Sequence, residues 1–354
     1  MSEEPRPGTG PSGVPDVADE GFSRSADALE RRLLGAERLL RRRDVSGAAG
    51  VSLLSARRFW RALGFPNVGD VTEAFTESDV AALRSVVQLV REGVLDEETA
   101  LGLTRAMGRS ADRLANWQIQ LVAEALAESE AEDPGTNPAE RVGELLAEIV
   151  ERTEPLLTYA WRRHLASAVG RMVADADVDS GRAPGPVRTV GFADLVAFTR
   201  VVRRSTEREL ARLVQRFEAV TSDIVSAHGG RVVKTVGDEV LFVTTSVPSA
   251  GGIALDIADA MADDAQLPDV RVGMATGPVV ARLGDVFGTT VNRASRLTGV
   301  AAPGAVLVDE TTAARLDAAS GFEVVPQYRR ALRGIGSVTP SLVRRSTRRA
   351  TPGP

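Results

Sequence analysis

The sequence predicts an α+β protein in which an all-helical first half precedes a second half of mixed helices and strands. Three observations support this fold class. Apolar residues recur at helical spacing from Leu29 to about Asp175. From Val187 onward, strand-like apolar runs alternate with amphipathic helical stretches. Within that half, two apolar runs flank Gly237-Asp238, which is typical of two strands joined by a tight turn.

The composition sets limits on function. The chain has 354 residues, 43% apolar and 26% charged, which is ordinary for a globular protein of about two domains. Its net charge of −5 does not favour nucleic acid over the whole molecule. The absence of cysteine excludes disulfides and thiolate chemistry, and two histidines cannot form a multi-histidine zinc site. We find no long apolar run and no signal peptide, so we expect a cytoplasmic protein without a membrane span.

The first helical region has the outline of a helix-turn-helix. Residues 1–28 are rich in Pro, Gly and acid, and we expect them to form a disordered tail. After the small-residue turn Gly50-Val51, Ser52 is placed to cap a second short helix that carries several arginines.

Residues 49–83 resemble the reading head of mercury-regulator-type transcription factors, in the AGVS turn, the aromatic-bearing second helix and the FTESDV opening of the next helix. Two interpretations follow. The segment either binds DNA or is a helical module without a nucleic-acid ligand, with Phe59, Trp60 and Leu63 in its core and its arginines on a solvated or partner-facing surface. We expect the second, and therefore no nucleic-acid partner.

Three further helices complete the first half. Thr76 and Asp79 predict a capped helix start, and Asp96 predicts the start of the next helix. An acidic Pro/Gly loop follows at residues 129–137. The last long helix is expected to break near Pro155 and then to resume.

The second half has the order β-α-β-β-α-β, which predicts a ferredoxin-like unit with extra elements at its C-terminal end. Asp194 interrupts an apolar strand just before a helix, and Asp238 lies at the tip of the predicted hairpin. Two aspartates at the turns of neighbouring strands are what a divalent-metal phosphate site requires.

The stretches FADLVAFT, KTVGDEV and GDVFGTTVNRASR occur in the order and spacing of the class III nucleotidyl cyclases, and residues 187–344 resemble that family's catalytic domain. The whole chain resembles the soluble actinobacterial adenylate cyclases, in which an all-α regulatory domain precedes the cyclase domain. The resemblance implies that Asp194 and Asp238 hold two Mg²⁺ or Mn²⁺ ions per site. It also implies that Lys234 and Asp285 read the adenine base and select ATP.

The resemblance assigns the remaining roles as well. Asn292 would orient the ribose, and Arg296 would stabilise charge on the α-phosphate. Arg333 stands where the family often has a phosphate-binding lysine. The family's site lies between two catalytic domains, and this chain has both sets of residues, so a homodimer with two complete sites is implied.

We divide the chain by these signals into five segments: a disordered tail (1–28), an all-α regulatory domain (29–138), a connecting helix and linker (139–186), the cyclase domain (187–346) and a second disordered tail (347–354). The relatives' architecture implies that the helical half controls catalysis in response to a small effector or a proton. We expect the amphipathic stretch Tyr159–His164 to transmit the signal, with His164 as a candidate proton sensor.

Two alternative functions share part of this pattern. A diguanylate cyclase also has a Gly-Asp-Glu turn, but it should carry two glycines before that Asp-Glu, whereas Val236-Gly237 stands there, and it lacks the helix with Asn292 and Arg296. The other alternative is a DNA-binding regulator with a catalytically silent cyclase-like domain. The intact metal pair and base-reading pair argue against it.

Overall fold

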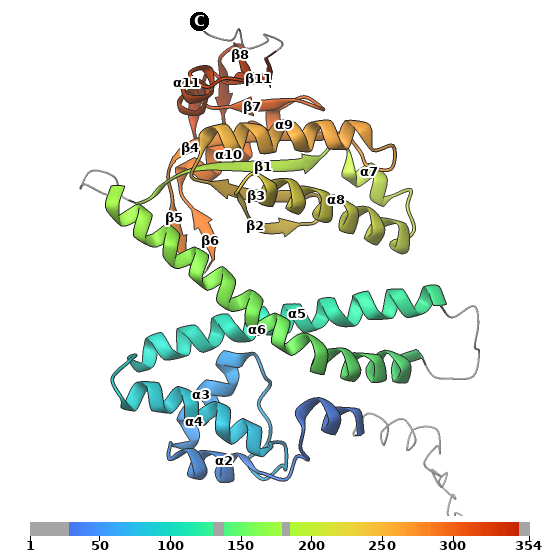
Figure 1. The fold of residues 1–354 in the computed structure, drawn as a ribbon, viewed down its shortest axis with the longest axis vertical. Coiled ribbons are helices and arrows are strands. Elements are labelled where there is room, and N and C mark those ends of the chain that lie inside the picture. Colours follow the sequence, from blue (N-terminus) through green and yellow to red (C-terminus); the bar gives the residue numbers. More distant parts are fainter. Residues whose placement is uncertain (1–27, 130–137, 179–184, 283, 347–354) are drawn as a thin grey trace, which may run out of the picture. The chain divides into compact units, whose positions relative to one another are not determined.

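The computed structural model describes residues 28–129, 138–178, 185–282 and 284–346 (Figure 1). The two predicted tails, most of the acidic loop and part of the linker before the second half lie outside these residues. The chain forms two compact units, residues 1–168 and residues 169–354. No helix in the described ranges is long and apolar enough to cross a membrane.

The first unit is helical, as the fold class predicted. Its helices are α2 (Arg42–Ala49), α3 (Leu53–Leu63), α4 (Glu77–Arg91), α5 (Glu97–Ser129) and the larger part of α6 (Pro138–Val178). Three predicted caps are confirmed. Ser52 accepts from the Ser55 amide, Thr76 and Asp79 form a capping box, and Asp96 Oδ1 accepts from the Thr99 amide at 2.7 Å.

Aromatic rings form the core of this unit. Phe59 and Trp60 are buried, their ring centroids lie 4.7 Å apart, and Phe75 packs on Trp60 at 5.2 Å. Leu63 packs against the same cluster, so the predicted core of the helix-turn-helix outline is confirmed.

The arginines of α3 have intramolecular partners. Arg57 binds Asp70 at 2.6 Å, Arg58 binds Glu97 at 2.8 Å, and the same Asp70 holds the buried Arg42. The hydrogen bond from Arg57 lowers the pKa of Asp70. Arg57 and Arg58 therefore each have a carboxylate partner within the same helical unit.

The expected break near Pro155 is wrong, because α6 runs through this residue without interruption. Proline removes one backbone donor and one intrahelical hydrogen bond, which costs about 3 kcal/mol in a helix interior. Seventeen residues precede Pro155 in α6 and twenty-three follow it. The remaining hydrogen bonds of so long a helix hold its two halves in one element.

The second unit is built on a seven-stranded sheet with the order β2-β3-β1-β4-β7-β11-β8. Its strands are β1 (Val187–Leu195), β2 (Arg231–Val236), β3 (Glu239–Thr244), β4 (Val270–Pro278), β7 (Val306–Val308), β8 (Phe322–Pro326) and β11 (Ser341–Arg345). Two small ribbons add β5 (Val280–Arg282) with β6 (Asp285–Phe287), and β9 (Arg330–Leu332) with β10 (Gly336–Val338). The helices are α7 (Phe198–Val202), α8 (Glu207–Ala227), α9 (Val247–Asp263), α10 (Thr289–Val300) and α11 (Glu310–Asp317).

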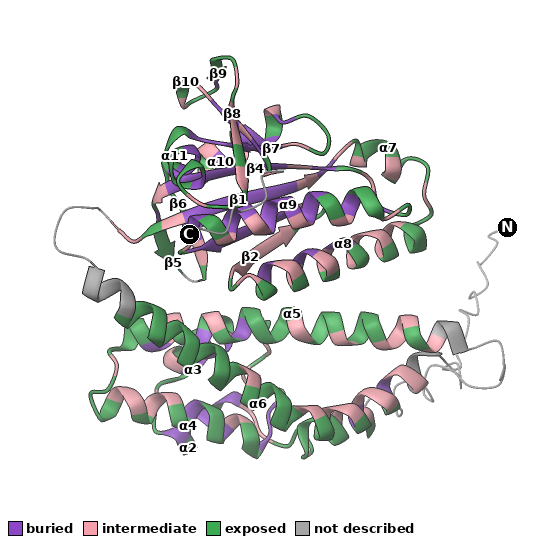
Figure 2. Ribbon diagram, turned by 45° about the horizontal axis from the view of Figure 1, so that its top comes forward, coloured by how far each residue is buried: buried purple, intermediate pink, exposed green. Residues whose placement is uncertain are grey.

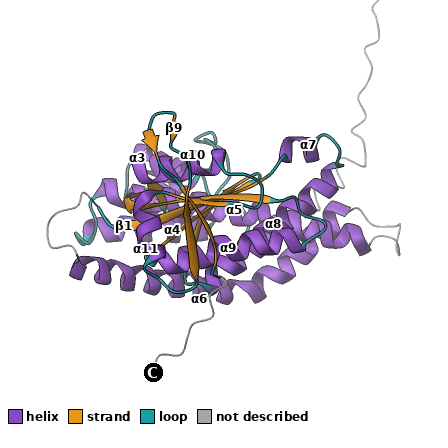
Figure 3. Ribbon diagram, turned by 90° about the horizontal axis from the view of Figure 1, so that it is seen from above, coloured by secondary structure: helices purple, strands orange, loops and turns teal. Residues whose placement is uncertain are grey.

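The first four strands have the ferredoxin-like order, as predicted. Alternate residues of β1 supply two cores. Ala193 and Leu195 pack with α8 and α9, whereas Val190 and Phe192 face the α10 side of the sheet. Figure 3 shows α10 on the opposite side of the strands from α8 and α9, and Figure 2 shows how strongly the strands and α9 are buried.

Helix α10 approaches the sheet closely because β4 presents glycine beneath it. A Cβ at Gly273 would lie 2.2 Å from the Thr298 amide nitrogen and 2.6 Å from the Ala294 carbonyl oxygen. Both atoms belong to the backbone of α10, so they cannot move without moving the helix. The absence of a side chain at this position therefore sets the distance between α10 and β4.

We predict that Gly273→Ala lowers the free energy of unfolding by about 1–3 kcal/mol, since the added methyl group must displace α10. Gly299→Ala is the matched control, because nothing lies within 4 Å of a Cβ there, and it should be neutral or slightly stabilising. Urea titration of both variants measures the difference. Equal unfolding midpoints for the two variants would contradict the close packing.

Candidate active site

Asp194 lies near the end of β1, between the two strands that pair with it. Its register partner on β3 is Glu239, and its partner on β4 is Arg271. Because side chains alternate along a strand, Asp194 shares the α10 side of the sheet with Val190 and Phe192. The sheet thus places a carboxylate at the edge of an apolar face, where it is 14% exposed.

Asp238 is positioned by the tight turn between β2 and β3. Gly237 has φ 62°, a conformation that glycine adopts without strain. The Asp238 carbonyl accepts from the Leu195 amide at 3.0 Å, which ties the turn to the end of β1. The local sequence signal therefore brings the two predicted aspartates to one end of the sheet.

The charges at this end of the sheet are unbalanced. Burial raises the pKa of the Asp238 carboxyl, and the Asp194 charge raises it further. Burial also raises the pKa of Glu239, with added repulsion from Asp194 and Asp238. Both pKa values are thus raised chiefly by burial, with a smaller contribution from the neighbouring carboxylates.

Sequence reasoning missed Arg271, the cation that partly offsets this charge. Its Nε and Nη2 atoms lie 2.6 and 2.5 Å from Asp194 Oδ2. The missed signal was a single charged residue in the apolar run of β4, whose register places it beside Asp194. Glu239 was noted in the turn but was not assigned to the site.

The residues present fit a hard divalent cation. Asp194 and Asp238 offer carboxylate oxygens, the ligands that Mg²⁺ and Mn²⁺ prefer, and a cation beside Asp238 would offset the repulsion from Asp194 that contributes to its raised pKa. Over the ranges that the structure describes, no group of three or more His, Cys, Asp or Glu side chains is placed to hold a metal ion. The remaining ligands would then come from substrate oxygens and water.

Lys234 and Asp285 form the second predicted pair, and the structure brings them together. Lys234 on β2 places its Nζ 2.7 Å from Asp285 Oδ2 at the start of β6. Asp285 Oδ1 accepts from the Val286 amide at 2.8 Å. Burial is the largest single influence and would raise the pKa of Asp285. The hydrogen bonds from Lys234 and the Val286 amide, together with the positive charges of Lys234 and Arg231, outweigh burial, and the pKa is lowered. Lys234 and Asp285 therefore form an ion pair, although they lie 51 residues apart in the sequence.

Asn292 and Arg296 lie one turn apart on α10, as predicted, and both are exposed. The opposite side of the helix is buried through Thr290, Ala294 and Leu297. Among the described residues, no hydrogen bond or ion pair joins Asn292 or Arg296 to the aspartates or to Lys234. One chain therefore displays these two groups outward.

Arg333 follows β9 in the turn toward β10 and is exposed. The flanking Leu332 packs with Leu297 of α10, so the ribbon that carries Arg333 is attached to the catalytic unit. No described residue pairs with the Arg333 guanidinium.

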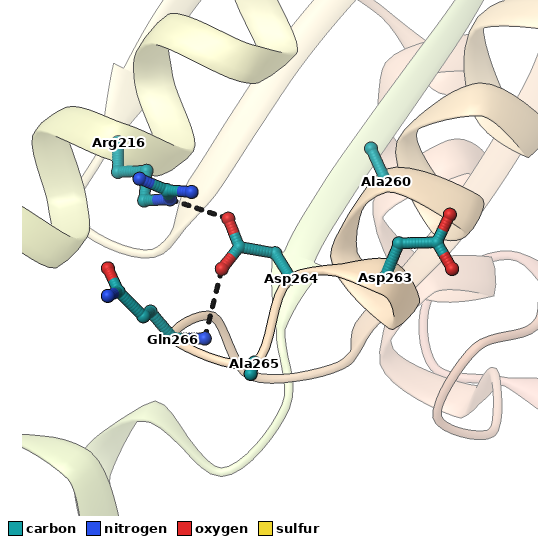
Figure 4. Close-up of a pocket in the computed structure, with 6 residues that line it drawn as sticks. All are labelled: Arg216, Ala260, Asp263, Asp264, Ala265 and Gln266. Atoms are coloured by element: carbon teal, nitrogen blue, oxygen red, sulfur yellow. Dashed lines mark hydrogen bonds and ion pairs between the residues drawn. The ribbon is translucent and has the colours of Figure 1, made fainter.

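A separate surface hollow of about 380 Å³ lies between α8 and the end of α9 (Figure 4). Its lining residues are Arg216, Ala260, Asp263, Asp264, Ala265 and Gln266. Arg216 Nε binds Asp264 Oδ2 at 2.5 Å across it. None of the predicted site residues lines this hollow. We interpret the Arg216–Asp264 contact as a structural ion pair at the surface.

Comparison with known proteins identifies the family of the chain. Residues 185–343 match the family model described as the adenylate and guanylate cyclase catalytic domain. A protein of Glutamicibacter nicotianae named adenylate cyclase is 44% identical over 344 residues, which cover 94% of this chain and 85% of the relative. An adenylate cyclase of Streptomyces coelicolor is 41% identical over 365 residues, covering 95% and 93%.

Among solved structures, the catalytic core of a rhodopsin-guanylyl cyclase with converted specificity, in complex with ATPαS, is 25% identical with a TM-score of 0.43. It covers 45% of this chain and 97% of that one. The family match and the full-length identity to the actinobacterial proteins decide the assignment. The chain belongs to the class III adenylate cyclases that carry a helical N-terminal region.

Proposed function

We propose that this chain converts ATP to 3′,5′-cyclic AMP and pyrophosphate. The observation that carries the choice of substrate is the contact of Lys234 with Asp285 at 2.7 Å. Adenine presents a ring nitrogen acceptor next to an exocyclic amine donor. An ammonium beside a carboxylate complements that pattern, whereas guanine presents the reverse. The adenylate cyclase names of the two relatives agree with this choice.

Asp194 and Asp238 would hold Mg²⁺ or Mn²⁺, two ions in each site. When bound, the ions neutralise triphosphate charge and acidify the ribose 3′-hydroxyl. Arg271 is already the counter-charge of Asp194, so its guanidinium stays beside the triphosphate when a cation takes that carboxylate. The site thus keeps positive charge close to the phosphate groups.

The remaining residues act on the reacting atoms. The ribose 3′-oxygen attacks the α-phosphorus, the bond to the bridging oxygen of pyrophosphate breaks, and the hydroxyl proton leaves to solvent. The Asn292 amide would orient the ribose, and the Arg296 guanidinium would stabilise negative charge that grows on the α-phosphate. Arg333 would bind the outer phosphates.

A homodimer accounts for the outward direction of Asn292 and Arg296. In a twofold dimer, each chain can present these groups to the aspartates of the other, which gives two shared sites. Helix α6 also displays a row of exposed large apolar residues, which a second copy would cover: Leu156, Leu157, Tyr159, Trp161, Leu165, Val169, Met172 and Val173.

The helical unit is proposed to control the catalytic unit through α6, which belongs to both. The stretch Tyr159–His164 lies within this helix and is largely exposed, so it is accessible to a partner surface. Protonation of His164 would add a charge beside Arg162 and Arg163 on one helical turn. A small effector or a proton acting on the helical unit would then change the catalytic rate.

The base assignment predicts the effect of the double change Lys234→Glu with Asp285→Cys. Use of Mn²⁺-ATP, measured as kcat/KM, should fall at least about 100-fold, because both contacts to adenine are lost. Use of Mn²⁺-GTP should fall less or rise. The control is Arg216→Gln with Asp264→Asn, which removes an exposed pair elsewhere. Unchanged ATP preference in the double variant would show that these residues do not read the base.

The metal and dimer assignments predict complementation. Asp194→Ala and Asn292→Ala chains should each lose at least about 100-fold in activity, because one lacks a metal ligand and the other lacks the ribose contact. Mixing the two should restore activity, since half of the sites in a mixed dimer carry neither change. The control for subunit exchange mixes two samples of the same variant that carry different labels, and detects dimers that contain both labels. Exchange without recovery would exclude a shared site.

The regulatory assignment predicts that a chain beginning at Pro184 differs in activity from the full chain. We expect the shortened chain to have a different rate and to depend less on pH between about 5.5 and 8, because the helical unit and His164 are both absent. The full-length His164→Ala variant separates these causes. Equal activity of both lengths at every pH would remove the regulatory proposal, whereas a pH response that survives His164→Ala would remove only the sensor.

A further inference from the structure

Arg293 stands next to Asn292 on α10, yet its side chain serves a different purpose. Its Nη1 atom lies 3.2 Å from Oδ2 of Asp309, the residue that caps the N-terminus of α11. Asp309 is 1% exposed, whereas the Arg293 side chain is 39% exposed. A buried carboxylate outside the proposed site thus holds the helix that carries two of the proposed substrate contacts.

The fold fixes Asp309 independently of Arg293. Its Oδ1 atom accepts from the Thr312 amide at 3.0 Å, from the Thr312 hydroxyl at 2.6 Å and from the Thr276 amide at 3.3 Å. The Thr276 hydroxyl contacts the Thr312 hydroxyl at 2.7 Å and the Thr189 hydroxyl at 3.0 Å. Burying a carboxylate is costly unless such bonds satisfy it, and here they come from β4 and α11. Asp309 is therefore a rigid anchor.

Other contacts also tie α10 to the sheet: Thr290 Oγ1 donates to the Pro278 carbonyl at 2.8 Å, and Thr298 Oγ1 donates to the Phe192 carbonyl at 3.4 Å. Gly273 and Gly277 of β4 bring the helix close but present no side chain that interlocks with it. Consecutive helical residues point about 100° apart, so a rotation that moves Arg293 moves Asn292 and Arg296 by the same angle. The Arg293 Nε atom is buried and has no hydrogen-bond partner among the described residues, so Nη1 makes the tie.

We propose that Arg293 is a positioning residue for cyclisation. Its ion pair with Asp309 sets the rotation of α10, and thereby places the Asn292 amide and the Arg296 guanidinium on the substrate held by the partner subunit. This rests on the function proposed above. Contacts that strengthen in the transition state depend on accurate placement, so a looser α10 lowers kcat and leaves KM almost unchanged.

The test uses full-length Arg293→Gln and Asp309→Asn with Mn²⁺-ATP. Gln removes the cation, and Asn removes the anion while it can still cap α11. Each kcat should fall about 10-fold or more, with KM for ATP within about twofold of wild type. The double variant should lose no more than either single one, since both remove one contact. Amide hydrogen exchange in α10 should become faster in each.

Arg216→Gln is the matched control, because it breaks an Arg–Asp pair that faces solvent between α8 and α9 (Figure 4). Its kcat should equal that of wild type.

Wild-type kcat in folded Arg293→Gln, or additive losses in the double variant, would overturn the positioning role. If Arg293→Gln does not fold, Asp309→Asn decides alone: a wild-type kcat with unchanged amide exchange in α10 would overturn the positioning role. A wild-type chain that makes no cyclic AMP would refute the proposed function instead. In that case, unchanged amide hydrogen exchange in α10 of both variants would still refute the claim that the Arg293–Asp309 ion pair holds the helix.

Discussion

The position of β1 between β3 and β4 is the constraint on which the site depends. Its antiparallel register sets Asp194 opposite Glu239 on one side and opposite Arg271 on the other. A slip of one residue would turn Asp194 into the core beneath α8 and α9, where Ala193 and Leu195 now pack. The apolar alternation of β1 forbids that slip, so the residues that form the core also fix the carboxylate.

The same register concentrates negative charge, and this has a thermodynamic consequence. Because the folded pKa values of Asp238 and Glu239 are raised, these groups favour the folded state most below their unfolded pKa values. That contribution is lost as the pH rises through the raised folded pKa values. At neutral pH the ionised forms of these two carboxyls therefore cost folding free energy, chiefly because the groups are partly buried.

The features that could be predicted from the sequence are those that depend on residues close together in the chain. Period changes identified the helical half and the ferredoxin-like order, and the Gly-Asp turn placed Asp238 at a hairpin tip. Arg271 and Asp309 were missed, because each acquires its partner through strand register or burial between residues distant in sequence. The break expected at Pro155 was wrong for a related reason: a local propensity was judged without the length of helix on either side of it.

Different sides of helix α10 pack against the sheet and carry the residues that we propose contact the substrate. One side of the helix is pressed against the glycines of β4, the exposed side carries Asn292 and Arg296, and Arg293 reaches a buried anchor between them. Close glycine packing fixes distance but not direction, and an exposed side fixes neither. A helix used in this way needs directional contacts. Helix α10 has an ion pair with the buried Asp309, in addition to the hydrogen bonds that Thr290 and Thr298 donate to strand carbonyls. Accuracy at the reacting atoms therefore depends on residues that never touch the substrate.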